Sequence, residues 1–266
     1  MSSGLYLSLA ATLFLSMATI VALSPQLNRP RIFWFNVGPA AAWAGAAALF
    51  GVGRHWSAAL SADLWVAVAA SSVLFLVVSL IYREARRLTV LIMPYLLLLA
   101  ILATISQTQE QLGVSEDAPP VWVGAHILVS VTTLGLLTLA AAAALACFIQ
   151  ARALKLKRPN GLSRLLPAVS ESERLYERLL ILSEIVLAAG VATGMATEFA
   201  ETGRLLIIDH KTLFSLLAFA LIGGLIAGRR WGGVRGQIAV RLLLVAYSFV
   251  LLGYFGVKFV KQVLLS

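Results

Sequence analysis

Long apolar stretches separated by short polar connections run along the whole sequence. Each is close to the ~20 residues that an α-helix needs to cross a hydrocarbon layer. We expect helices over residues 4–23, 33–52, 64–82, 88–106, 122–153, 171–197, 212–227 and 237–260. No period-two alternation of the kind found in membrane β-barrels is visible. The pattern therefore predicts an all-α, polytopic integral membrane helical bundle with about eight transmembrane helices.

Composition agrees with this prediction and limits the possible partners. Hydrophobic residues make up 60% of the chain and charged residues 12%, against ~25% charged in soluble domains. We expect a single transmembrane domain over residues 1–266, with four N-terminal helices in 1–106 and a second half in 121–266. The net charge of +9 comes from residues in short loops, so membrane lipid is the expected partner and nucleic acid is not.

The signs of the loops predict how the chain is oriented. The connections after the first, third, fifth and seventh helices are basic, whereas all the charged residues in the segment 107–120 are acidic. Basic loops stay in the cytoplasm, so both termini are expected outside. No basic residue precedes the first apolar stretch, which we therefore interpret as a retained helix and not as a signal peptide.

Two of the three histidines are expected near the outer ends of transmembrane helices. His126 lies about one turn inside the fifth helix and shares a helical face with Ser130 and Thr133. A polar stripe is costly in lipid, so this face should point into the bundle. His210 opens the seventh helix, and His55 lies in a loop. Two imidazoles on alternate helices can hold a haem iron from both faces. A zinc or copper site, or simple hydrogen bonding to a neighbouring helix, remains open.

Few other residues suggest chemistry. Glu184 and Arg241 fall at similar depth in the sixth and eighth helices, which favours a structural ion pair, with proton transfer by Glu184 as the alternative. Cys147 is the single cysteine, which excludes an intramolecular disulfide and a CxxC motif. Ser170 to Glu173 matches the capping-box pattern and should begin the sixth helix. No phosphate-binding loop, HExxH motif or activated nucleophile is present, so we do not expect an enzyme.

Short motifs recur in a defined order through the second half of the chain. In sequence they are Gly124-Ala-His126, Ser172-Glu-Arg174, Thr193-Gly194, His210-Lys211, Trp231 to Arg235-Gly236, and Gly253-Tyr-Phe-Gly256. Together they resemble the cytochrome c assembly family of haem-handling membrane proteins, which includes the CcsA, CcmC and HemX types. The resemblance is closest to the small YpjD-like branch and covers residue 120 to the end.

In the haem-handling members of that family, two outward-facing histidines flank an external tryptophan-rich segment and ligate haem. The resemblance implies haem as cofactor, with His126 and His210 as axial ligands of its iron. It also implies a bacterial inner membrane and other cytochrome c assembly components as partners. Residues 198–209 contain no tryptophan, a departure that speaks against haem delivery to an apocytochrome. A regulator or scaffold acting through cytoplasmic loops, and a small transporter using Glu184, are the alternatives.

Overall fold

The computed structural model describes residues 3–24, 30–54, 60–107, 121–203, 209–234 and 236–256. Every regular element in these ranges is a helix, and they contain no strand. Eight of the described helices are long and apolar enough to cross a membrane, judged by length and composition. The prediction of an all-α bundle with about eight transmembrane helices is therefore confirmed.

The chain packs as two compact units. The first comprises Met1–Asp117 and Ala142–Leu175, and the second comprises Ala118–Ala141 and Tyr176–Ser266. Residues 142–175, which include the last part of the fifth transmembrane stretch, belong to the first unit.

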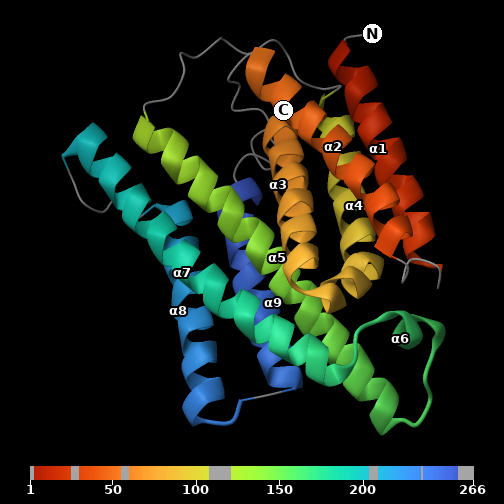
Figure 1. Cartoon of the computed structure of the whole chain (residues 1–266). Coiled ribbons are helices and arrows are strands. Elements are labelled where there is room, and N and C mark those ends of the chain that lie inside the picture. The colour runs from red at the N-terminus through yellow and green to blue at the C-terminus, as the bar shows by residue number, and fades with distance from the viewer. Residues whose placement is uncertain are drawn as a thin grey trace. The chain divides into compact units, whose positions relative to one another are not determined.

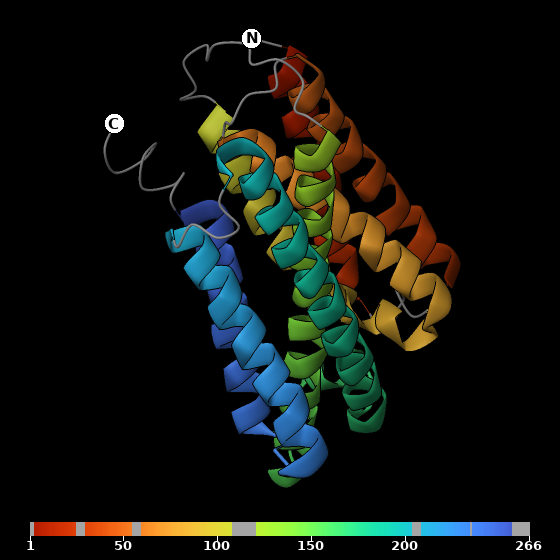
Figure 2. The ribbon, with the colours of Figure 1, turned by 90° about the vertical axis from the view of Figure 1, so that its left-hand side faces the viewer.

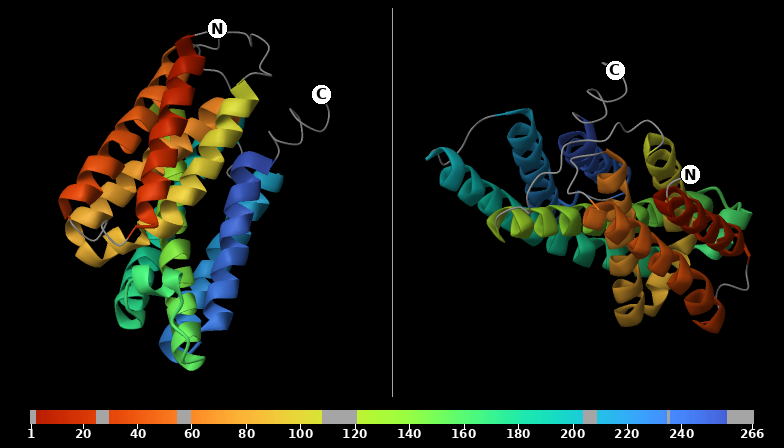
Figure 3. Two further views of the ribbon diagram at one scale, coloured as in Figure 1. Left: turned by 90° about the vertical axis from the view of Figure 1, so that its right-hand side faces the viewer. Right: turned by 90° about the horizontal axis from the view of Figure 1, so that it is seen from above.

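Four helices and a 3-10 helix form most of the first unit. They are α1 (Ser3–Ala22), α2 (Pro30–Arg54), α3 (Leu60–Ile81), η2 (Arg83–Leu88) and α4 (Thr89–Gln107). Helix α1 packs against α2 and α4, and α3 packs against the same two helices (Figure 3). The unit also contains the last part of α5 and the short helix α6 (Gly161–Leu165).

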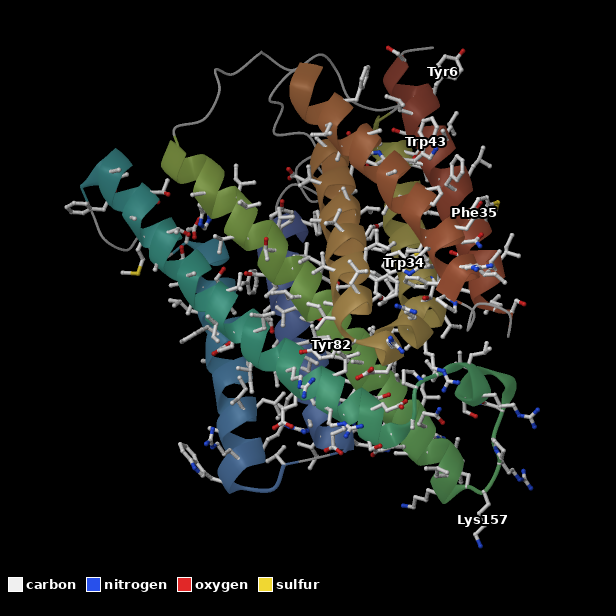
Figure 4. All side chains as sticks on the ribbon, in the orientation of Figure 1. Tyr6, Trp34, Phe35, Trp43, Tyr82 and Lys157 are labelled. Atoms are coloured by element: carbon white, nitrogen blue, oxygen red, sulfur yellow. The ribbon has the colours of Figure 1, made fainter. Side chains whose placement is uncertain are left out.

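Aromatic side chains fill the first unit near its arginine-rich turn. Phe33 is fully buried, and its ring lies edge-on to Phe75 at 5.8 Å between centroids. The guanidinium of Arg86 lies 5.6 Å from the Trp34 ring, and its Nε donates to the carbonyl of Ser79. Phe35, in contrast, is 76% exposed on the outside of α2 (Figure 4). Apolar side chains on the outside are expected of a helix that faces lipid.

The second unit is built from the first part of α5 (Val121–Lys155) and most of α7 (Val169–Thr202), together with three later elements. These are α8 (His210–Trp231), α9 (Gln237–Leu251) and the π-helix η3 (Leu252–Gly256). Helices α8 and α9 run antiparallel side by side (Figure 2). Phe214 of α8 stacks on Phe249 of α9 at 5.9 Å. The hydroxyls of Thr138 in α5 and Tyr247 in α9 are hydrogen-bonded at 2.8 Å.

Helices α5 and α7 are the longest in the chain (Figure 1). Helix α7 begins at Val169, ahead of the expected capping box at Ser170 to Glu173. The backbone N–H of Ala168 donates to the Glu171 carboxylate at 3.0 Å. Glu171 stands three residues after Ala168, the position from which a carboxylate reaches back to the N-cap. The predicted capping residues are therefore wrong, although a helix start in this region was expected correctly.

Candidate functional site

A polar contact joins His126 of α5 to α7. Its Nδ1 lies 3.2 Å from Oγ1 of Thr193, and the imidazole is partly buried. The ring lies over Gly194, where an added β-carbon would come within 3.1 Å of the imidazole Cε1 and 3.5 Å of Nδ1. A β-carbon at this position would therefore press on the imidazole, which would have to shift by a few tenths of an ångström.

Gly190 and Gly194 explain how α5 and α7 come so close. The two glycines are four residues apart on α7, so they share one helical face. A β-carbon at Gly190 would lie 3.6 Å from Cγ1 of Val129, one turn along α5 from His126. Small residues at this spacing let transmembrane helices approach closely. The predicted inward-facing stripe on α5 thus lies against a glycine face of α7, and Thr133 of that stripe is buried.

Two contacts fix how α7 and α8 run past each other. A β-carbon at Gly223 of α8 would lie 3.0 Å from Oε1 of Glu184 on α7. Further along α8, the guanidinium of Arg229 lies 4.8 Å from the ring of Tyr176, which precedes Glu184 on α7. The helices are therefore antiparallel. His210 lies thirteen residues before Gly223, or about 20 Å of helix, which puts the start of α8 beside the end of α7.

This register brings the backbones of the two predicted ligands to the same end of the second unit. His126 touches Thr193, in the later part of α7, and α8 begins with His210 beside that part of the helix. Asp209 caps α8, because its carboxylate accepts the backbone N–H of Thr212 at 2.8 Å. The side chain of His210 lies outside the described part of the structure, as does the whole of His55.

The described residues do not include the expected ion pair between Glu184 and Arg241. Arg241 is exposed on α9, whereas Oε2 of Glu184 is buried and has no hydrogen-bond partner among the described atoms. Similar depth in two helices does not bring two side chains together, because each must also lie on the facing side of its helix. Val240 and Leu243 occupy the inward side of α9, and Arg241 therefore points away from it. The described geometry therefore gives the predicted pair no support.

No metal site of the ordinary multi-ligand kind is present in the described ranges. Among their residues, no group of three or more histidine, cysteine, aspartate or glutamate side chains could hold a metal ion. The single cysteine, Cys147, is partly buried on α5. A zinc or copper site normally needs three or four protein ligands, so the geometry gives those alternatives no support.

Thr193 and Gly190 are the residues of this site that sequence reasoning missed. Thr193 was recognised only as one member of an ordered motif, and the sequence did not assign it a contact. The signal available was the Gly-x-x-x-Gly spacing of Gly190 and Gly194, which marks a face for close helix packing. This spacing could have identified the face of α7 that packs closely against another helix, but not which helix that is.

Comparison with known proteins extends the resemblance to both units. The sequence profile of the family described as Cytochrome C assembly protein matches residues 34–265. A protein of Azospirillum brasilense, described as an uncharacterized 28.8 kDa protein in the nifR3-like 5' region, is 46% identical over 271 residues, covering all of both chains. No solved structure matches this chain. The eight apolar helices and the family match establish a multi-pass membrane protein, and the chain belongs to the cytochrome c assembly protein family.

Proposed function

We propose that this protein binds haem through His126 and His210 and presents it during cytochrome c assembly, without catalysing a covalent step itself. The observation that carries the proposal is the contact of His126 with Thr193 in a member of this family. An imidazole anchored through Nδ1 keeps Nε2 as the nitrogen for a metal. His210 supplies the second ligand, because α8 begins at the same end of the second unit.

The donor set suits haem better than a bare metal ion. A porphyrin provides four nitrogen ligands, so the protein needs to add only one or two axial groups. The chain offers two histidines at one end of a helical unit, and its described residues hold no cluster of three or more metal-binding side chains. Bound haem would supply its iron chemistry, and the protein would orient and shelter the porphyrin.

The site is proposed to lie at the outer face of a bacterial inner membrane. The acidic segment of residues 107–120 precedes α5, and most of the basic residues lie toward the other ends of these helices. Under the positive-inside rule, the end that carries His126 and His210 is then outside, as are both termini. The absence of tryptophan from residues 198–209 leads us to expect weak retention of haem, because less aromatic surface covers the porphyrin. We also retain the YpjD-like branch as the proposed position within the family.

The test is haem uptake by purified protein in detergent, followed by absorbance spectroscopy after excess haem is added and removed. Wild type should bind haem with a Soret band typical of two nitrogen ligands. His126→Gly and His210→Gly should each shift the spectrum and weaken retention, since one axial bond remains in each variant. Added imidazole should restore the wild-type spectrum of both, because it can occupy the space left by the lost ring.

His55→Gly is the matched control, because it removes an imidazole that is not one of the two proposed ligands. It should bind haem as wild type does. Size-exclusion profiles of all variants should agree, so that a loss of haem is not a loss of fold. Equal uptake and identical spectra for wild type and the His126→Gly, His210→Gly double variant would refute the proposal. A role as regulator or scaffold through the cytoplasmic loops would then be favoured.

A further inference from the structure

The hydroxyl of Thr193 lies between its own helix and the imidazole of His126. Its Oγ1 is 2.9 Å from the carbonyl oxygen of Ala189, 3.1 Å from that of Gly190, and 3.2 Å from Nδ1 of His126. A threonine hydroxyl has one proton to donate and two lone pairs with which to accept. The group to which Thr193 donates this proton therefore decides whether Nδ1 of His126 donates or accepts in their hydrogen bond.

The distances favour donation to the α7 backbone. Bonds in which a hydroxyl donates to oxygen are ~2.5–3.0 Å long, whereas N–H···O bonds extend to ~3.2 Å. The 2.9 Å contact to Ala189 suits the first kind, and the 3.2 Å contact to Nδ1 suits the second. If the hydroxyl donates to its backbone, it can only accept from His126.

Other threonines in this chain show the same arrangement. Thr138 donates to the carbonyl of Leu134 at 2.8 Å and is also bonded to the Tyr247 hydroxyl. With its own proton used, Thr138 must accept from Tyr247. Hydroxyls of helical threonines commonly bond the carbonyl one turn back, and Thr19, Thr132 and Thr133 do so at 2.8–2.9 Å.

We propose that Thr193 is a positioning residue that holds His126 in the tautomer with a proton on Nδ1. The Nε2 atom of that tautomer carries the lone pair, which is the form that ligates a metal. Gly194 permits the contact, because its missing side chain leaves room for the ring edge. The second half of the inference, that this lone pair is presented to haem iron, rests on the function proposed above.

The tautomer can be measured without haem. The chain has three histidines, so the protein labelled with ¹⁵N-histidine gives three imidazole patterns in long-range ¹H–¹⁵N spectra. The pattern of His126 is identified by its loss in His126→Gly. In apo wild type we expect protonated Nδ1 and unprotonated Nε2 at His126. The opposite pattern would overturn the proposal outright, whether or not the protein binds haem.

Two variants of Thr193 separate the hydroxyl from the space that it fills. Thr193→Val keeps the shape and removes the acceptor, so His126 should shift toward the Nε2–H tautomer that free histidine prefers in water. Thr193→Ser keeps the hydroxyl and should retain the wild-type pattern. An unchanged tautomer in Thr193→Val would mean that the hydroxyl does not set it. Asp209→Asn replaces the cap of α8 by another good capping residue. It is a control that should fold normally and leave the tautomer of His126 unchanged.

Haem affinity tests the second half separately. Loss of a partner that orients a metal-binding histidine typically lowers metal affinity ~10–100-fold, and we expect at least ~10-fold for Thr193→Val, with near-wild-type affinity for Thr193→Ser. If apo His126 has the expected tautomer but wild type binds no haem, the proposed function fails and the positioning contact stands. If wild type binds haem and Thr193→Val binds it equally, the hydroxyl has no role toward the iron.

Discussion

Replacement of Gly194 by alanine tests the contact between α7 and His126 most directly. The new methyl carbon would lie 3.1 Å from Cε1 of the imidazole, roughly half an ångström inside the ~3.5–4.0 Å optimum for two carbon atoms. The ring must therefore move away from α7. Such a movement lengthens the 3.2 Å bond between Nδ1 and Thr193, and at ~3.6 Å that bond no longer exists.

Gly190→Ala provides an internal reference of the same chemical kind. Its methyl carbon would lie 3.6 Å from Cγ1 of Val129, which is ordinary van der Waals contact. Both substitutions add one methyl group to the same helix, and both gain the ~0.5–1 kcal/mol by which alanine exceeds glycine in a helix. This gain cancels in the comparison, so the difference between the variants reports the overlap with the imidazole.

We expect Gly194→Ala to have a free energy of unfolding ~1–3 kcal/mol below that of Gly190→Ala, the usual cost of overpacking. The assay is unfolding of each purified variant by sodium dodecyl sulfate at a fixed concentration of mild detergent. In a His126→Ala background the ring is gone, and the two glycine variants should then unfold alike. Such coupling between contacting residues is what a double-mutant cycle measures.

Two results would refute this reasoning. One is an equal free energy of unfolding for Gly190→Ala and Gly194→Ala, within ~0.5 kcal/mol. The other is a difference that persists unchanged after His126→Ala, since the overlap would then involve some other group. Either result would also remove the geometric basis for the positioning role of Thr193, because both depend on the same approach of α5 to α7.

Two further predictions concern charge. Glu184→Gln keeps the shape of a side chain whose Oε2 is buried without a hydrogen-bond partner among the described residues, so unfolding with sodium dodecyl sulfate should show no loss of stability. In the double variant with Arg241→Gln, the change in the free energy of unfolding should equal the sum of the two single changes within ~0.5 kcal/mol. A larger coupling would show that the two side chains do interact as an ion pair. Reporter fusions should show a cytoplasmic location after Arg87, Arg158 and Gly232. Fusions after Glu116 and Gly203 should show an outside location, and a cytoplasmic signal at Glu116 would invert the proposed topology.

The fold class and the position of the helices were predictable because they depend on local composition. A stretch of ~20 apolar residues is stable in lipid only when its backbone is hydrogen-bonded internally, so hydropathy alone indicates a helix. The ordered motifs around His126 and His210 likewise indicated the family from the sequence alone. The start of α7 was less accurate, since Ser170 and Glu171 both suit a helix start and only the backbone position of Ala168 decides between them.

Contacts between helices were not predictable in the same way. Glu184 and Arg241 share a depth, yet Arg241 lies on the exposed side of α9, so the pair suggested by a sequence count of helix turns has no support in the described contacts. Likewise, residues 142–175 pack in the first unit, which their position in the chain does not indicate. The depth of a residue in the membrane follows from its distance along the chain. Which side chain it contacts depends instead on how each helix is rotated about its own axis.

The site shows the same division between sequence and structure. The sequence by itself determined that an imidazole lies inside a membrane helix and that its face is polar. Only the tertiary structure brought Thr193 to its Nδ1, across 67 residues of chain. Lipid is as apolar as the helix surfaces, so hydrophobicity does not select which transmembrane helices meet. That selection depends on close packing, here at Gly190 and Gly194, and close packing requires the shapes of both helices.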